Sequence, residues 1–103
     1  MSWSIKVQPL AEQHTAHEDD ITYNLGKMLR QAGFDPNLHD GVTVKVLRPI
    51  AQGAWQSLYE NEKHYKQFEP ENGWGTYTDA LLFMARLSDY TRNAPDDYVM
   101  RVS

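Results

Sequence analysis

The chain has 103 residues, no cysteine and a formal net charge of −4. This length predicts a single domain over residues 1–103, and the lack of cysteine excludes disulfides and zinc sites with thiolate ligands. The ten basic residues are scattered, which argues against a nucleic-acid-binding face. Because no apolar run is long enough for a membrane span and the first residues lack a signal-peptide pattern, we expect a soluble cytoplasmic protein without a membrane partner.

The first residues predict a strand followed by an exposed loop. Trp3, Ile5 and Val7 alternate with polar residues, which is typical of a strand with one buried face. Pro9 ends this pattern because it lacks the N–H that a strand ladder needs. Residues 10–20 carry no apolar period, so we expect them to form a loop.

A helix is predicted next, because apolar residues recur at helical spacing in Leu25, Met28, Leu29 and Ala32. Asn24 is the expected N-cap and Thr22 the alternative. Gly33 stands where a left-handed C-cap belongs, and Phe34 is placed to close that cap against the helix. The helix should therefore end at Gly33.

Residues 40–68 permit two interpretations. Alternating valines favour a strand over residues 42–48, whereas apolar residues continue at helical spacing as far as Tyr59. We favour a helix that begins at or soon after Thr43, carries Pro49 in an early turn or at a kink, and ends near His64. The strand over residues 42–48 remains the alternative.

The last third predicts a loop, a buried helix and a strand. Thr76 or Thr78 caps a helix that runs to about Thr91 and is apolar nearly all round, so it should be the buried central element. Residues 98–102 form a final strand. The fold class is then helix-dominated α+β, with about three helices packed on a minimal sheet of the N- and C-terminal strands.

A candidate binding site combines residues at two predicted helix starts: Tyr23, Asn24, Asn72, Trp74 and Tyr77. Gly73 and Gly75 flank the tryptophan, so a turn of special shape should present its ring. If the two helix starts converge, aromatic walls and free N–H groups could hold a planar or anionic ligand, or a loop of a partner protein. The alternative is structural, with Asn24 as a simple cap and Trp74 sealing the core.

Two weaker patterns have ordinary explanations. His14 and His17, with Glu18, Asp19 and Asp20, could ligate a metal, but a histidine pair in a loop lacks fixed ligand geometry, so we expect a solvated loop and no metal. Glu60 and His64 are spaced as a helical i, i+4 pair and could orient a general base. We interpret them as an exposed surface pair.

Catalytic motifs are missing from the sequence. There is no cysteine nucleophile, no Gly-x-Ser-x-Gly elbow, and Gly73-Trp74-Gly75 lacks the spacing of a phosphate-binding loop. These absences favour a non-enzymatic protein without a cofactor, and a small hydrolase or metal-dependent enzyme is the less favoured alternative.

The stretches Ile21-Thr22-Tyr23-Asn24 and Asn72-Gly73-Trp74-Gly75-Thr76-Tyr77 together resemble a group of small bacterial and phage proteins that pair an "ITYN" with an "NWG-x-Y" motif. This chain departs from the pattern by the extra Gly73. The group has no established activity, so the resemblance implies no catalytic residues. It implies that the two motifs lie together in space and suggests a phage or prophage accessory protein.

The sequence thus favours a small binding protein that uses the surface around its two motifs. Its partner would be a small ligand in a concave pocket or a protein on a flatter patch. In the second case the chain would act as an inhibitor or adaptor, with Trp74 as the anchor and acidic residues beside it: Glu60, Glu62, Glu69 and Glu71. The chain is expected to be a monomer or a homodimer, because terminal strands can leave an edge open for pairing.

Overall fold

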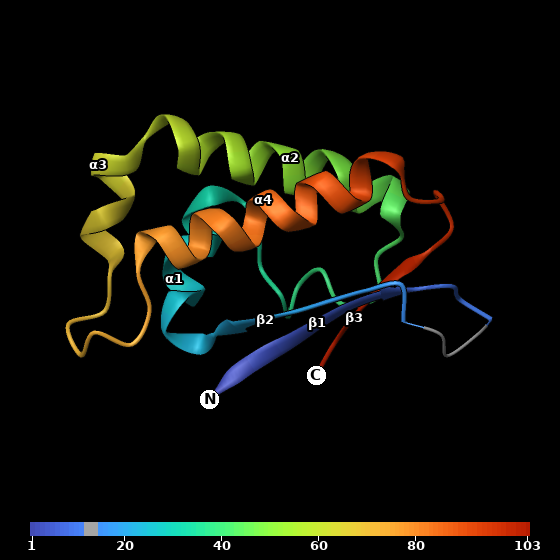
Figure 1. Ribbon diagram of the computed structural model, residues 1–103, viewed down its shortest axis with the longest axis horizontal. Coiled ribbons are helices and arrows are strands. Elements are labelled where there is room, and N and C mark those ends of the chain that lie inside the picture. Colours follow the sequence, from blue (N-terminus) through green and yellow to red (C-terminus); the bar gives the residue numbers. More distant parts are fainter. Residues whose placement is uncertain (12–14) are drawn as a thin grey trace.

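The computed structural model describes residues 1–11 and 15–103, and within them the chain forms two layers (Figure 1). One layer is an antiparallel sheet of β1 (Ser2–Gln8), β2 (His17–Thr22) and β3 (Val99–Val102) in the order β2-β1-β3. Helices cover one face of this sheet. The predicted α+β class, with helices dominant and the two terminal strands paired, is confirmed.

Strand β1 is central in the sheet, where it pairs with both β2 and β3. Its side chains alternate between buried and partly exposed positions, as the sequence predicts. Trp3, Ile5 and Val7 are buried, and the residues between them lie on the partly exposed face. Ile5 pairs with Val102 of β3, and backbone bonds between Ser4 and Ser103 at 2.8 and 3.0 Å continue the ladder. Both chain ends are therefore held at the sheet.

The expected loop over residues 10–20 is wrong from His17 onward, where β2 begins. Ile21 is the one fully apolar inward residue of this strand, so the local sequence carries little strand signal. The strand forms because it pairs with β1 along its whole length and because Asp19 binds Arg86 of the last helix, with Nε to Oδ2 at 2.6 Å. Both are tertiary contacts.

The first helical segment begins with a 3₁₀ turn, η1 (Tyr23–Leu25), and continues as α1 (Gly26–Ala32). Thr22 is the cap, since its Oγ1 accepts from the Asn24 N–H at 3.3 Å, so the expectation that Asn24 is the cap is wrong. Gly33 ends α1 in the left-handed conformation (φ 106°), and the Phe34 N–H donates to the Leu29 carbonyl at 3.0 Å. This is the predicted Gly33 cap, of the Schellman type.

Helix α2 (Val44–Glu60) confirms the helical interpretation of its segment, including a start just after Thr43 and Pro49 in the second turn. The alternative strand is reduced to one isolated bridge between Thr43 and Val99. The helix ends at Glu60, before the expected His64, because the Asn61 backbone leaves the helical region (φ −131°). The short helix α3 (Glu62–Tyr65) and the 3₁₀ turn η2 (Lys66–Phe68) follow.

Helix α4 (Tyr77–Asn93) runs antiparallel to α2 and packs beside it above the sheet (Figure 1). Its start is a capping box: the Asp79 N–H donates to Thr76 Oγ1 at 3.1 Å, and the Thr76 N–H donates to Asp79 Oδ2 at 3.0 Å. The helix is central, but the expectation that it is buried nearly all round is wrong. Leu82 is 49% exposed, because α4 has one face toward the sheet and another toward solvent.

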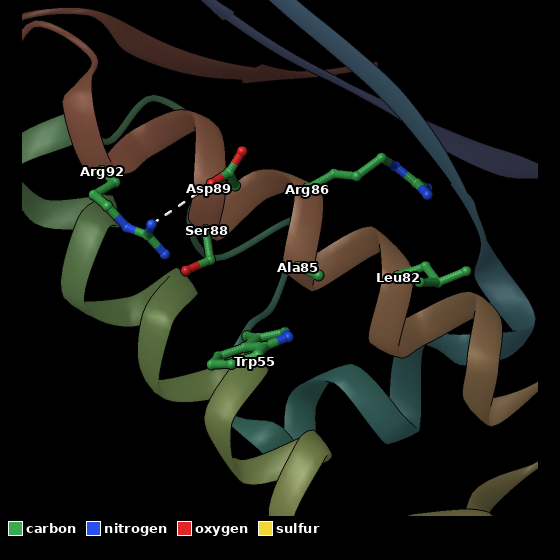
Figure 2. A pocket seen from close by; sticks show the side chains of 7 residues that line it. All are labelled: Trp55, Leu82, Ala85, Arg86, Ser88, Asp89 and Arg92. Carbon is green, nitrogen blue, oxygen red and sulfur yellow. Dashed lines mark ion pairs between the residues drawn. The ribbon is translucent and has the colours of Figure 1, made fainter.

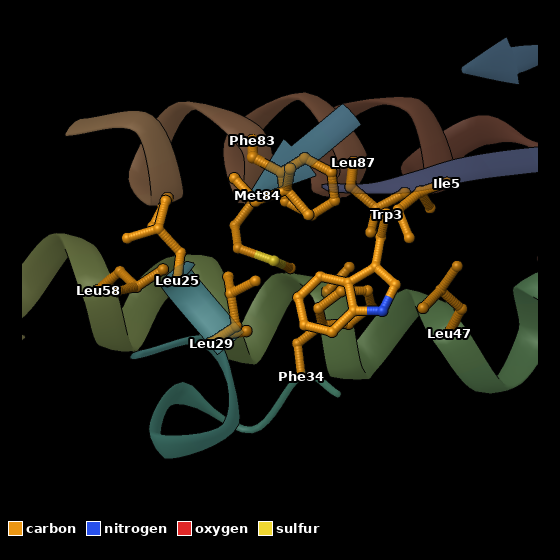
Figure 3. Packing of buried hydrophobic residues seen from close by; sticks show 14 of the residues in the cluster. Trp3, Ile5, Leu25, Leu29, Phe34, Leu47, Leu58, Phe83, Met84 and Leu87 are labelled. Carbon is orange, nitrogen blue, oxygen red and sulfur yellow. The ribbon is translucent and has the colours of Figure 1, made fainter. Parts of the chain in front are cut away.

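The core lies between the sheet and the helical layer (Figure 3). Rings and branched side chains from every layer meet there, including Ile5, Phe34, Leu47, Phe83 and Leu87, all fully buried. Phe34 and Phe83 pack at a tilt of 50° with ring centroids 6.0 Å apart. None of the helices among the described residues has the length and apolar character needed to cross a bilayer.

Candidate functional site

The two sequence motifs lie against each other in the fold, and Gly75 is the point of contact. A Cβ atom placed on Gly75 would stand 2.9 Å from Thr22 Cγ2 and 3.0 Å from Leu25 Cγ. Such distances are too short for any side chain, so only glycine lets the loop before α4 approach η1 this closely. The loop preceding Tyr77 is thereby docked on the segment that carries Tyr23 and Asn24.

Trp74 projects from this docked loop and is 71% exposed. Asn72 Oδ1 accepts from the Trp74 N–H at 2.9 Å, forming an Asx turn, and Gly73 takes a left-handed φ of 76°. The turn is thus defined by hydrogen bonding and by glycine conformation. An indole held on such a turn and left in solvent is not a seal on the core.

Tyr23 and Asn24 complete the exposed part of the candidate site. Asn24 is exposed, and Tyr23 is 43% exposed with its ring packed on Trp3 at a centroid distance of 4.6 Å. The Trp3 ring supports Tyr23 from the core side. We use the term Trp74 surface for the exposed set Tyr23, Asn24, Asn72 and Trp74.

Tyr77, the fifth predicted site residue, does not belong to this surface. It is only 3% exposed, and its hydroxyl donates to the Leu58 carbonyl of α2 at 2.5 Å. Its N–H donates to Glu69 Oε2 at 2.6 Å, which fixes the loop before α4. Tyr77 faces inward because it is the first residue of α4 and shares the helix face of Ala80 and Met84.

The pocket that the first motif helps to line includes no residue of the Trp74 surface. The pocket nearest to the first motif has a volume of about 200 Å³ and lies between β2 and α4. It is lined by Asp20, Ile21, Thr22, Asp79, Leu82 and Arg86. Trp74 and Asn72 are not among them, so the geometry favours a protruding contact over an enclosed pocket.

The proposed histidine pair gives no metal site in the described residues. His14 lies outside them, and in residues 1–11 and 15–103 no group of three potential ligands gathers. His17 stacks on Tyr90 of α4, with ring centroids 4.8 Å apart and an angle of 17° between the rings. Asp19 is occupied by its ion pair with Arg86.

The Glu60 and His64 pair is also not made. Glu60 Oε1 accepts from Gln56 Nε2 at 3.1 Å, one turn back in α2. His64 packs edge-on against Tyr65 and Phe68, with centroid distances of 5.0 and 5.4 Å. The break at Asn61 places Glu60 in α2 and His64 in α3, so the two residues are not one turn apart on a single helix.

His17 should make the stability of this edge of the fold depend on pH. Burial lowers its pKa below the ordinary value of 6.5, a shift opposed by Asp19 and reinforced by Arg86. The unfolded chain therefore binds the proton first as the pH falls, and the folded state loses stability below the unfolded pKa. We expect His17→Phe, which keeps a ring against Tyr90, to lose less free energy of unfolding between about pH 7.5 and about pH 5.5 than the wild type.

Urea unfolding at the two pH values measures this difference. His64→Phe, which removes an exposed histidine by the same substitution, serves as the matched control. If His17→Phe and the wild type lose stability equally on acidification, burial of His17 does not govern the acid response.

Comparison of the chain with protein-family models, with curated protein sequences and with solved structures gave no significant match.

One feature that the sequence reasoning missed is a groove between α2 and α4, lined by Trp55 and by one side of α4. Trp55 lies within the apolar pattern that predicts the helix after Thr43, and Arg86 and Arg92 belong to no sequence motif. The groove has no local signature, because it depends on how two helices distant in sequence lie side by side.

Proposed function

We propose that this chain is a non-enzymatic binding protein that docks a partner protein through the Trp74 surface. The observation that carries the proposal is the 71% exposure of Trp74 on a turn that the fold holds in place. Tryptophan is enriched among the residues that dominate binding energy at protein interfaces.

Preorganisation of the turn supports an anchoring role. The Asn72 side chain fixes the Trp74 backbone, and Gly75 locks the loop against Thr22 and Leu25. Binding then costs less backbone conformational entropy on this side of the interface, because the turn that carries the indole is already held in place. A flexible loop with the same residues would have to be ordered by the partner.

The surroundings of Trp74 favour a protein partner with a basic rim. Glu69 and Glu71 lie in the same loop, and both are exposed, in a chain whose net charge is −4. Such charges act mainly on the rate of association and on partner selection. The partner would present an apolar cavity for the indole, ringed by lysine or arginine, and the chain would act on it as an adaptor or inhibitor.

The resemblance of the two motifs to small bacterial and phage proteins agrees with this type of function. Gly75 packs against Thr22, so each motif contributes to one local structure. We infer that the chain acts as an accessory factor through binding, which needs no residues beyond those of the Trp74 surface.

The proposal is tested by comparing wild type with Trp74→Ala in affinity capture from cell extract, followed by a binding assay with the purified captured protein. We expect Trp74→Ala to weaken that binding by at least about 30-fold, the size expected for an interface anchor. Leu38→Ala is the matched control, because Leu38 is 73% exposed and lies outside the Trp74 surface. It should bind as the wild type does.

Equal binding of Trp74→Ala and wild type would refute the role of Trp74. Thermal unfolding of each variant is the necessary companion measurement. Since the indole lies mainly in solvent, Trp74→Ala should keep wild-type stability to within about 0.5 kcal/mol. A larger loss of stability would make Trp74 a structural residue instead.

A further inference from the structure

A groove of about 380 Å³ lies between α2 and α4 and shares no residue with the Trp74 surface (Figure 2). Its walls come from one side of α4, on which Ser88 is itself largely buried, and from one residue of α2: Trp55, Leu82, Ala85, Arg86, Ser88, Asp89 and Arg92. The volume is in the range of small-molecule pockets, roughly 300–1,000 Å³.

One end of the groove is apolar and flat. The Trp55 ring is half-buried and stacks on Tyr59, with centroids 5.4 Å apart and an angle of 19° between the rings. Leu82 and Ala85 of α4 line the same groove. A planar apolar group would find an aromatic wall and two aliphatic contacts there.

The other end offers hydrogen-bond donors. Arg92 is 69% exposed, and its nearest carboxylate, Asp89, lies 3.7 Å from Nη1, beyond hydrogen-bonding distance. Within the part of the chain that the structure describes, neither the Arg92 guanidinium nor the Ser88 hydroxyl makes a hydrogen bond to another residue, and both lie along the same wall (Figure 2). An oxyanion could accept from both groups.

The helix pair at this end is rigidly connected. Arg48 of α2 donates from Nε to the Thr91 carbonyl at 2.8 Å and from Nη2 to the Ala94 carbonyl at 2.9 Å. The same guanidinium pairs with Asp96. These bonds fix α2 against the end of α4 that carries Arg92, so the groove is present before any ligand arrives.

We propose that this groove binds a small amphipathic anion, a planar apolar ring that carries a carboxylate. The ring packs between Trp55 and Leu82, and the carboxylate accepts from Arg92 and Ser88. Charge supports this choice, because Arg92 is an exposed cation of the lining that meets Asp89 only at 3.7 Å, whereas Arg86 is already paired with Asp19. The Asp89 carboxylate repels the carboxylate of the ligand and so limits the affinity. This proposal does not depend on the Trp74 surface.

The test is a titration of the ¹⁵N-labelled protein with 2-naphthoate up to about 10 mM, a range suited to a ligand of this size. The three tryptophan indole N–H signals are assigned with single Trp→Phe variants. We expect the Trp55 signal to shift in a saturable way. The uncharged analogue 2-naphthylmethanol should bind about 5- to 10-fold more weakly, because it cannot form the charged hydrogen bonds.

Two variants with opposite expected effects sharpen the test. Arg92→Gln should weaken 2-naphthoate binding by about 3- to 10-fold, and Asp89→Asn should strengthen it by about 2-fold. Lys45→Gln, an exposed charge on α2 that does not line the groove, should leave binding unchanged. Both groove positions are solvent-exposed, so these variants should fold as the wild type does.

Three results would each overturn the proposal. They are the absence of any Trp55 shift, equal binding of the acid and the alcohol, and an equal loss of affinity in Arg92→Gln and Lys45→Gln. A shift confined to the Trp74 indole is one form of the first result, and it would leave the proposed function of the Trp74 surface intact.

Discussion

Phe83→Ala is expected to lower the free energy of unfolding by about 3–5 kcal/mol, the usual cost of removing a fully buried ring. Phe83 lies in α4 at the centre of the core and packs against Phe34, so the truncation leaves a cavity between the helical layer and the sheet. The surrounding side chains come from several elements and relax only in part. A domain of this size is stable by about 5–15 kcal/mol, so the loss is a large share of the total.

Leu82→Ala is the matched control for this variant, one residue earlier on the same helix. Leu82 is 49% exposed, so its truncation should cost less than about 1 kcal/mol. Denaturant unfolding of both variants, with thermal unfolding in support, gives the comparison. Phe83→Ala should lower Tm by at least about 12 °C. Equal losses at the two positions would contradict the placement of α4.

Gly75→Ala is expected to destabilise the fold by about 2–5 kcal/mol. The backbone of Gly75 has a φ of 118°, which strains any residue with a Cβ atom, at a cost of about 1–2 kcal/mol. In addition, the new methyl group would meet Thr22 Cγ2 and Leu25 Cγ at 2.9 and 3.0 Å. Because Leu25 is fully buried, it cannot move aside easily, and overpacking adds about 1–3 kcal/mol.

Gly73→Ala distinguishes the cost of backbone strain from the cost of a steric clash of the added methyl group. Gly73 also has a left-handed backbone, with a φ of 76°, but no atom outside its chain neighbours lies within 4 Å of the added Cβ position. Its cost should stay near the strain alone, about 1 kcal/mol. Urea unfolding of both variants measures the difference. If the two variants are equally stable, the close approach of the two motifs at Gly75 does not contribute to stability.

Features whose cause is local were predictable from the sequence. The Gly33 cap and the start of α2 at or soon after Thr43 were predicted, and Thr76 was one of the two predicted caps of α4, because a helix terminus is determined by a few neighbouring residues. The Trp3, Ile5 and Val7 alternation likewise identified β1, the strand with the strongest apolar period.

Features whose cause is a distant contact were not predictable. β2 has a polar sequence and is a strand because β1 pairs with it and α4 holds Asp19. In the candidate site, too, local features were predictable and features that depend on distant contacts were not. The sequence named Trp74 and Asn72, but whether Trp74 would face solvent and Tyr77 the core depended on where α4 lies over the sheet. The groove at Trp55 gave no sequence signal at all.

By itself, the sequence determined the positions of most helices and of the two terminal strands, and it placed glycines on both sides of Trp74. Those properties follow from side-chain period, caps and backbone freedom, which act over a few residues. Only the tertiary structure decided which face of α4 is buried, since Leu82 and Phe83 are equally apolar neighbours. Packing against the sheet on one side alone leaves Leu82 in solvent and encloses Phe83.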